Sequence, residues 1–233
     1  MRSLFSNDRV SNDGALNFSA FNGLLLLSVI VTALVALPAS AKLIKPSPQT
    51  IVVFGDSLSA GYGLLQNQGW VALLQARITQ QKRPYTVINA SISGETTSGG
   101  LARFNTMLAS QKPSIVILEL GANDGLRGLP VSDLRRNLSS MIVQAKTTKI
   151  QLLLVGMKIP PNYGKKYSQD FSDSYALLAT QHHIKLVPFL LEGVAGKPDL
   201  NQNDGLHPLP IAQPQLLNNV WAQLENVLKI TQK

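Results

Sequence analysis

Short apolar runs alternate with longer amphipathic segments from residue 51 to the C-terminal end of the chain. The apolar runs are rich in Val, Ile and Leu and are bounded by Gly, Pro, Asn or Asp, which is typical of buried strands. The longer segments repeat their apolar positions every three to four residues, which is typical of helices that bury one face. The pattern predicts strands at 51–54, 85–89, 114–120, 151–156 and 185–189, and helices at 70–81, 98–108, 131–147, 168–181 and 210–230.

This alternation predicts the fold class, an α/β domain in which five parallel strands are wrapped by helices through right-handed crossovers. The segment 114–120 reads Ser-Ile-Val-Ile-Leu-Glu-Leu, and its apolar run indicates a strand that is buried on both faces. Ser132 is the expected N-cap of the helix at 131–147, and Pro210 is expected near the start of the last helix.

Three loops that follow the first three predicted strands are rich in Gly, Ser and Asn. In open α/β sheets, ligands bind beyond the carboxyl ends of the strands, so these loops are expected to meet at one functional edge. The loops are Gly55-Asp56-Ser57, Ser91-Ile92-Ser93-Gly94-Glu95-Thr96 and Gly121-Ala122-Asn123-Asp124.

The first 41 residues differ from the rest of the chain. The segment from Gly23 to Leu37 is uncharged and apolar, and Ala39-Ser40-Ala41 has the small-x-small pattern that a signal peptidase accepts. These features predict a signal peptide over 1–41, a short tether over 42–49 and one domain over 50–233. An uncleaved signal anchor is the alternative, although the apolar run is shorter than the ~20 residues of a membrane span.

Composition removes several classes of function. The chain has no Cys, which excludes disulfides, a Cys nucleophile and a thiolate metal site. The formal net charge is +8, but the basic residues are scattered and aromatic residues do not interleave with them. This pattern favours a solvated surface over a nucleic-acid partner, and it leaves open weak attraction to anionic membranes or substrates.

A serine and a histidine stand where acyl transfer would need them. Ser57 directly follows the first predicted strand, and His207 is preceded by Asp204 at a spacing that one turn can close. A carboxylate at this distance could hold one imidazole tautomer and stabilise the imidazolium. The alternative is an ordinary turn with an Asp cap and an exposed His. Ser59 and Ser93 compete with Ser57 as nucleophile.

The remaining candidate groups are hydrogen-bond donors. The Asn123 side chain and the backbone N–H groups of Gly94 and Ser57 could stabilise an oxyanion, although each position is also a normal turn former. His182 and His183 end a predicted helix and are interpreted as a polar connector. No metal-ligand cluster, phosphate loop or dinucleotide fingerprint occurs in the sequence, so no metal and no cofactor are expected.

Together these residues resemble the SGNH (GDSL) hydrolase superfamily, and most of all its exported multifunctional esterases of the arylesterase, thioesterase and lysophospholipase type. Four sequence blocks of that superfamily occur in order within 51–230. They are Gly55-Asp56-Ser57-Leu58, Gly94, Gly121-Ala122-Asn123-Asp124 and Asp204-Gly205-Leu206-His207.

The resemblance implies a flavodoxin-like three-layer α/β/α sandwich with a parallel five-stranded sheet. It also implies Ser57 as nucleophile, His207 as base and Asp204 as the residue that orients His207. The Ser57 N–H, the Gly94 N–H and the Asn123 side chain would form the oxyanion hole.

The expected function is a serine esterase that cleaves carboxylic ester and thioester bonds of small acyl substrates through an acyl-enzyme. The protein is expected to be a monomer, exported to the bacterial periplasm or secreted, with no nucleic-acid partner and no stable membrane span after signal cleavage. Leu126, Leu129, Ile159 and Tyr163 are expected to line the acyl groove. Two alternatives are a carbohydrate acetyl esterase of the same superfamily and a non-catalytic flavodoxin-like domain that binds phosphate at its first loop.

Overall fold

The computed structural model of the chain describes residues 49–231, with side chains described as far as residue 229. The predicted signal peptide (1–41) and almost all of the predicted tether (42–49) lie outside the described residues. The five predicted apolar runs form one parallel sheet in the order β2-β1-β3-β4-β5. The strands are β1 (Gln49–Gly55), β2 (Tyr85–Asn89), β3 (Ile115–Glu119), β4 (Gln151–Val155) and β5 (Lys185–Val187).

This strand order is that of flavodoxin-like sheets, and it confirms the predicted α/β class with a parallel five-stranded sheet. The central strand β3 pairs with β1 and β4, and all five of its residues are buried. Helices cover both faces of the sheet, which is why the first four residues of this strand, 115–118, form a continuous apolar run rather than an alternating one.

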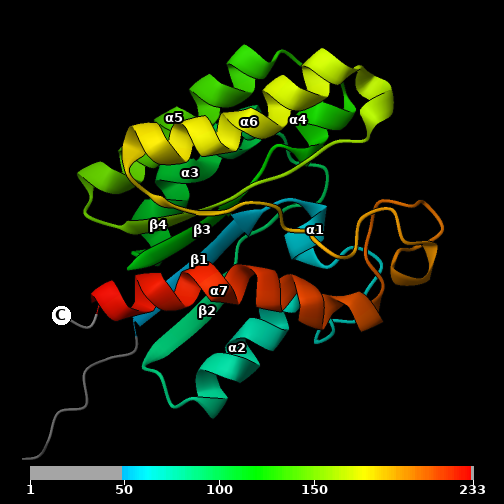
Figure 1. Cartoon of the computed structure of the whole chain (residues 1–233). Coiled ribbons are helices and arrows are strands. Elements are labelled where there is room, and N and C mark those ends of the chain that lie inside the picture. Colours follow the sequence, from blue (N-terminus) through cyan, green and yellow to red (C-terminus); the bar gives the residue numbers. More distant parts are fainter. Residues whose placement is uncertain (1–48, 232–233) are drawn as a thin grey trace, which may run out of the picture. The chain divides into compact units, whose positions relative to one another are not determined.

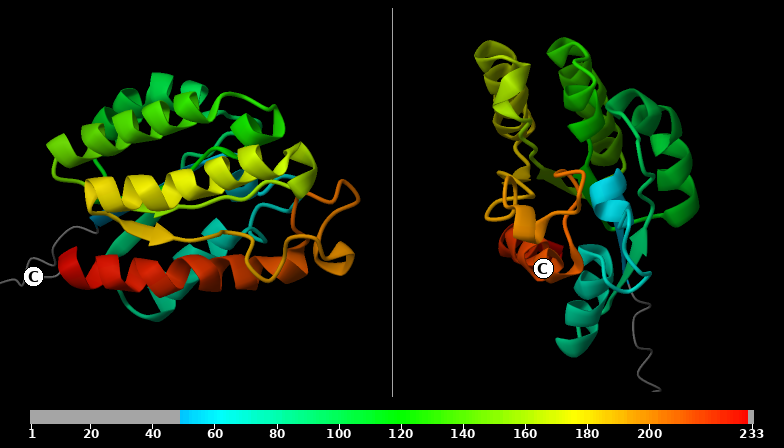
Figure 2. Two further views of the ribbon diagram at one scale, coloured as in Figure 1. Left: turned by 45° about the horizontal axis from the view of Figure 1, so that its top comes forward. Right: turned by 90° about the vertical axis from the view of Figure 1, so that its right-hand side faces the viewer.

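The helices form a layer on each side of the sheet (Figures 1 and 2). One layer holds α2 (Trp70–Gln80) and α7 (Gln213–Thr231), and the other holds α3 (Thr97–Gln111), α5 (Val131–Thr147) and α6 (Lys165–His182). Each helix buries one stripe of apolar residues, as helical periodicity requires. In α5 the stripe consists of Leu134, Leu138, Met141, Ile142 and Ala145.

Two short helices lie where the sequence predicts loops. They are α1 (Ser57–Ala60) and α4 (Ala122–Leu126), which follow β1 and β3. Helices of four and five residues contain little more than one turn, so they leave no periodic pattern in the sequence. Three single 3-10 turns complete the described elements, at Pro161–Tyr163, Pro198–Leu200 and Pro210–Ala212.

Two local predictions were wrong. Ser132 is not an N-cap, because α5 begins at Val131 directly after Pro130 and Ser132 lies inside the first turn. The last strand ends at Val187 rather than at 189, because Pro188 has no N–H with which to continue the ladder.

All strands run in the same direction, so the sheet has two different edges along the strand axis. We call the loops that follow the strands the carboxyl edge; it faces the viewer in the right-hand view of Figure 2. We call the loops that lead into β2–β5 the amino edge, and these are 81–84, 112–114, 148–150 and 183–184. No helix within 49–231 is long and apolar enough to cross a membrane.

Candidate active site

Ser57 is presented at the carboxyl edge because β1 ends immediately before it and α1 begins with it. The turn is held by Asp56, whose carboxylate caps α1 by accepting the Leu58 N–H at 3.0 Å. Asp56 and the preceding residues 51–55 are buried, whereas Ser57 is half-buried. The buried strand therefore anchors a serine whose side chain remains accessible.

His207 lies in a turn that Asp204 organises. One carboxylate oxygen of Asp204 accepts the backbone N–H groups of Leu206 at 2.9 Å and His207 at 3.0 Å. The other lies 2.7 Å from His207 Nδ1, and His207 Nε2 lies 2.8 Å from Ser57 Oγ. The structure thus joins Ser57, His207 and Asp204 in one hydrogen-bonded chain across 150 positions of sequence.

The electrostatics of this chain favour one tautomer of His207. Although partial burial opposes ionisation, the hydrogen bonds from the His207 and Leu206 N–H groups and the His207 ring hold the pKa of Asp204 at about 2. An ionised Asp204 favours the proton on Nδ1, and the Nε2 lone pair then faces the Ser57 hydroxyl.

Two further residues, which no sequence pattern indicated, support His207 through a ring contact and backbone hydrogen bonds. The Tyr62 ring packs against the His207 ring with 4.5 Å between centroids. Gln202 donates from its side chain to the Tyr62 carbonyl at 2.9 Å and from its backbone to the His207 carbonyl at 2.7 Å. Tyr62 and Gln202 lie 140 positions apart, so no local pattern could have paired them.

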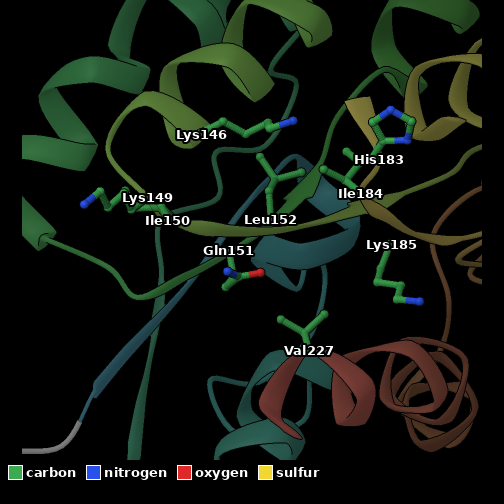
Figure 3. Close-up of a pocket in the computed structure, with 9 residues that line it drawn as sticks. All are labelled: Lys146, Lys149, Ile150, Gln151, Leu152, His183, Ile184, Lys185 and Val227. Atoms are coloured by element: carbon green, nitrogen blue, oxygen red, sulfur yellow. The ribbon is translucent and has the colours of Figure 1, made fainter. Parts of the chain in front are cut away.

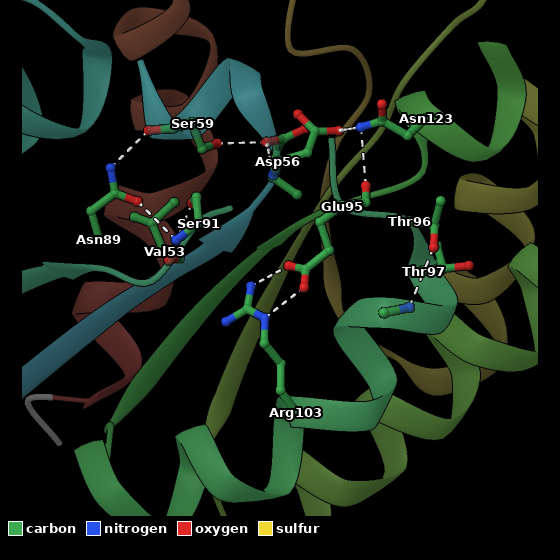
Figure 4. Close-up of polar contacts among 12 residues, drawn as sticks. Val53, Asp56, Ser59, Asn89, Ser91, Glu95, Thr96, Thr97, Arg103 and Asn123 are labelled. Atoms are coloured by element: carbon green, nitrogen blue, oxygen red, sulfur yellow. Dashed lines mark hydrogen bonds and ion pairs between the residues drawn. The ribbon is translucent and has the colours of Figure 1, made fainter. Parts of the chain in front are cut away.

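Asn123 lies in α4 and faces the serine turn. Its side-chain nitrogen donates to the Glu95 carbonyl at 3.0 Å and to the Asp56 carboxylate at 3.3 Å (Figure 4). Within residues 49–231, the backbone N–H groups of Ser57 and Gly94 donate to no other group. Two predicted oxyanion donors are therefore free, whereas Asn123 must exchange one of its acceptors before it can donate to a ligand.

A buried carboxyl pair lies beneath the serine turn. Glu119, at the end of β3, accepts the Ser59 hydroxyl at 2.6 Å and the Asp56 N–H at 3.3 Å. Burial raises the pKa of Asp56 to about 7. Burial and the charge of Asp56 also raise the pKa of Glu119 well above its usual range. The buried Ser59 hydroxyl thus donates to Glu119, whereas the alternative Ser93 is exposed, and the His207 ring bonds Ser57 and Asp204 instead.

The raised pKa of Asp56 has a consequence for stability. Between the unfolded value near 3.8 and about 7, the folded protein binds more protons than the unfolded chain, so this group makes the free energy of unfolding fall as pH rises. The variant Asp56→Asn keeps an oxygen that can cap Leu58 but has no proton to lose. Urea titrations at pH 5 and pH 7.5 should show that the free energy of unfolding of the variant rises relative to that of the wild type by up to ~1.4 kcal/mol per pH unit within that window. Parallel pH profiles of the two proteins would contradict this assignment.

A cavity of about 190 Å³ opens beside Ser57, Asn123 and His207. The predicted groove residues Leu126 and Ile159 line it, whereas Leu129 and Tyr163 do not. A second cavity, of about 370 Å³, extends away from Ser57 between the loop after β4 and the segment after β5. Both cavities are lined by Lys158, Ile159, Pro160, Leu191 and Leu206.

Tyr163 and Leu129 instead support the walls of this region. The Tyr163 hydroxyl donates to the Leu126 carbonyl at 2.9 Å, and the Leu129 carbonyl accepts the Tyr167 hydroxyl at 2.6 Å. Among the described residues, no group of three or more His, Asp or Glu side chains has a geometry that could hold a metal ion.

Three other polar residues named in the sequence analysis, Glu95, Asp124 and His182, have partners other than Ser57 and His207. The Glu95 carboxylate pairs with Arg103, and the Asp124 carboxylate accepts the Thr97 N–H at 2.8 Å. His182 lies 2.8 Å from the Ser139 hydroxyl, and it ends α6 at the amino edge, away from Ser57.

Comparison with known proteins gives consistent matches over the same region. The sequence model of the GDSL-like lipase/acylhydrolase family matches residues 53–212. The chain is 50% identical over 184 residues to the esterase TesA of Pseudomonas aeruginosa, and the match covers 79% of this chain and 92% of that protein. It is 40% identical to thioesterase 1/protease 1/lysophospholipase L1 of Escherichia coli K12, over 76% of this chain and 83% of that protein.

A solved structure agrees with these relatives. The crystal structure of TesA superposes with a TM-score of 0.75 at 50% identity, and the match covers 76% of this chain and 99% of that one. The similarity therefore extends from Ser57 through the cavity region to His207.

Proposed function

This chain belongs to the GDSL-like lipase/acylhydrolase family and hydrolyses ester bonds, and we propose that Ser57, His207 and Asp204 are its catalytic residues. The observation that carries the proposal is the hydrogen-bonded chain from Ser57 Oγ through the His207 ring to the Asp204 carboxylate. Ser57 is the nucleophile, His207 the general base, and Asp204 the group that orients the imidazole.

In the first half of the reaction, Ser57 Oγ attacks the carbonyl carbon while His207 Nε2 takes the serine proton. The resulting oxyanion accepts the free N–H groups of Ser57 and Gly94. It also accepts Asn123 Nδ2, which turns from Asp56 or Glu95 toward the substrate. His207 then gives its proton to the departing alcohol or thiol, and the acyl group remains bonded to Ser57.

In the second half, a water molecule takes the place of the leaving group. His207 Nε2 accepts a proton from the water as its oxygen attacks the acyl carbon, and the same donors stabilise the second oxyanion. The tetrahedral intermediate collapses, the proton returns to Ser57 Oγ, and the carboxylic acid leaves. No redox partner or metal is needed to balance these steps.

The two adjoining cavities support an acyl chain longer than acetyl as the substrate class. Four of the five residues that line both cavities are apolar, and the fifth is Lys158. Each methylene buried against such a wall contributes ~0.8 kcal/mol of binding. Esters, including aryl esters, and thioesters share the same carbonyl geometry, and the named relatives are an esterase and a thioesterase/lysophospholipase.

Blocking the second cavity should separate long from short substrates. Ala195 lines the second cavity but not the one beside Ser57, so Ala195→Trp should obstruct an acyl tail without touching the catalytic residues. We expect kcat/KM to fall at least ~10-fold for decanoyl esters and thioesters, but less than ~2-fold for acetyl esters. Ala222→Trp, at an exposed position of α7, is the control.

The same chain-length series tests the substrate class itself. A wild-type profile that peaks at acetyl esters would instead favour a carbohydrate acetyl esterase. An Ala195→Trp profile equal to that of the wild type would show that the second cavity does not hold the acyl tail.

We also propose export to the periplasm or the outside of a bacterial cell. The proposal depends on the apolar segment 23–37 and the Ala39-Ser40-Ala41 pattern, which lie outside the described residues. The N-terminal residue of the protein recovered from the cell envelope, which we expect to be Lys42, tests it.

A further inference from the structure

Charge is segregated between the two edges of the sheet. Within residues 49–231, every carboxylate except that of Glu225 lies at the carboxyl edge or in the half of a helix nearer to it. These residues are Asp56, Glu95, Glu119, Asp124, Asp133, Asp170, Asp173, Glu192, Asp199 and Asp204. The carboxyl edge also carries Arg and Lys residues, so its charges nearly balance.

The opposite edge is strongly basic. Among the described residues, eight Lys and Arg residues lie in the amino-edge loops, in the last turns of the helices that lead to them, or at the start of β5, and Glu225 is the single carboxylate there. Glu225 is itself paired with Arg83 at 3.2 Å. The basic residues are Arg77, Lys82, Arg83, Lys112, Lys146, Lys149, Lys185 and Lys229.

Attraction to the negative ends of helix dipoles explains only some of these basic residues. Five helices, α2, α3, α5, α6 and α7, end at the amino edge, and each contributes roughly half a negative charge there. Lys146 shows the expected local role, because it donates to the His182 carbonyl at the end of α6 at 2.8 Å. Five helix ends amount to about −2.5 charges, which is well below the excess of basic side chains.

A hollow of about 290 Å³ lies in the basic edge, between the loops that lead into β4 and β5 and the last turns of α7 (Figure 3). Lys146, Lys149, Lys185 and His183 surround it, and its lining contains no carboxylate. Its floor is formed by Ile150, Leu152, Ile184 and Val227. The edge is thus shaped to accept an anionic group over a short apolar base.

We propose that the amino edge is a docking surface for an anionic lipid bilayer. Its basic residues are spread over a whole face rather than along a groove. None of the large exposed apolar residues lies in the amino-edge loops, so no exposed Phe, Tyr or Trp ring in these loops offers stacking for nucleic-acid bases. For the same reason the contact is electrostatic, with headgroups at the lysines and no insertion into the hydrocarbon.

This orientation separates docking from catalysis. Ser57 lies beyond the far end of β1, whose seven residues span about 20 Å from the amino edge. The docked enzyme therefore keeps its active site in the aqueous phase. It would act on soluble or released acyl compounds near the membrane rather than on the lipids beneath it.

The test is sedimentation of the full chain with vesicles of phosphatidylcholine, with and without about 30 mol% phosphatidylglycerol. Only the increase in binding caused by phosphatidylglycerol is counted, because residues before Gln49 can also bind lipid. We expect a clear increase at about 0.1 M NaCl and its loss at about 0.5 M.

Two triple variants with equal charge changes locate the surface. Lys146→Glu/Lys185→Glu/Lys229→Glu changes exposed amino-edge residues that do not have positive φ, and it should lower affinity for the anionic vesicles by about 100-fold. Lys165→Glu/Lys166→Glu/Lys197→Glu changes exposed residues near the carboxyl edge and should retain most of the binding. Both variants should hydrolyse a soluble ester at the wild-type rate, which shows that they are folded.

Three results would overturn the proposal. The first is wild-type binding that does not increase with phosphatidylglycerol. The second is an equal loss in the two triple variants, which would mean that net charge rather than the amino edge is responsible. The third is tighter binding to duplex DNA than to the vesicles with the same dependence on the amino edge, which would assign this surface to nucleic acid.

Discussion

Replacing Ser57 with Ala is expected to remove nearly all ester hydrolysis, with a loss in kcat of about 10⁴- to 10⁶-fold. The hydroxyl supplies the atom that forms the acyl-enzyme, and no neighbouring group can take its place. Ser59 is buried and donates to Glu119, and Ser93 is exposed without a base beside it. The fold should be unaffected, because Ser57 is half-buried and Ala suits the first turn of α1.

The measurement combines turnover of a chromogenic acyl ester with covalent labelling by a fluorophosphonate. Wild type and Ser93→Ala should label and turn over equally, whereas Ser57→Ala should do neither. A labelled Ser57→Ala protein, or one with wild-type turnover, would disprove the proposed nucleophile and reopen the non-catalytic flavodoxin-like alternative.

Replacing His207 with Ala is expected to cost nearly as much, because the serine proton then has no acceptor within reach. His207 Nε2 lies 2.8 Å from Ser57 Oγ, and neither His182 nor His183 is near the carboxyl edge. Fluorophosphonate labelling should slow in parallel with turnover, since both reactions need the activated hydroxyl.

The rate of a double variant shows whether Ser57 and His207 act together in one step or contribute independently. The double variant Ser57→Ala/His207→Ala should be no slower than either single variant, whereas independent contributions would multiply. His183→Asn is the matched control, because Asn tolerates the left-handed backbone found there, at φ 52°. Substantial turnover by His207→Ala at neutral pH would show that another group is the base.

Much of the fold could be predicted from sequence because its elements leave local signals. The bounds of β2 and α5 match the prediction, and the other long helices and strands differ at their ends by a few residues. Buried parallel strands appear as unbroken apolar runs, and surface helices repeat every three to four residues. Elements of four or five residues, such as α1 and α4, contain little more than one turn and cannot show a repeating pattern, so these segments were predicted as loops.

Some residues of the candidate site could likewise be predicted from sequence, and others could not. Ser57, Asp204 and His207 were selected from sequence, and the structure brings the three together, although their catalytic roles stay predictions until the variants are measured. The groove was predicted only in part. Loop residues such as Leu129 and Tyr163 can face a cavity or support its wall, and their sequence looks the same in either case.

The order of residues along the chain is enough to infer the α/β class, the edge at which polar loops gather, and the residue types available for acyl transfer. Three features became visible only in the folded chain. Asn123 already donates to Asp56 and Glu95, Tyr62 and Gln202 contact His207, and basic residues collect at the opposite edge. Hydrophobic periodicity is encoded in neighbouring residues. Hydrogen bonds and charge clusters between loops depend instead on strand order and register, which bring distant positions within a few ångströms.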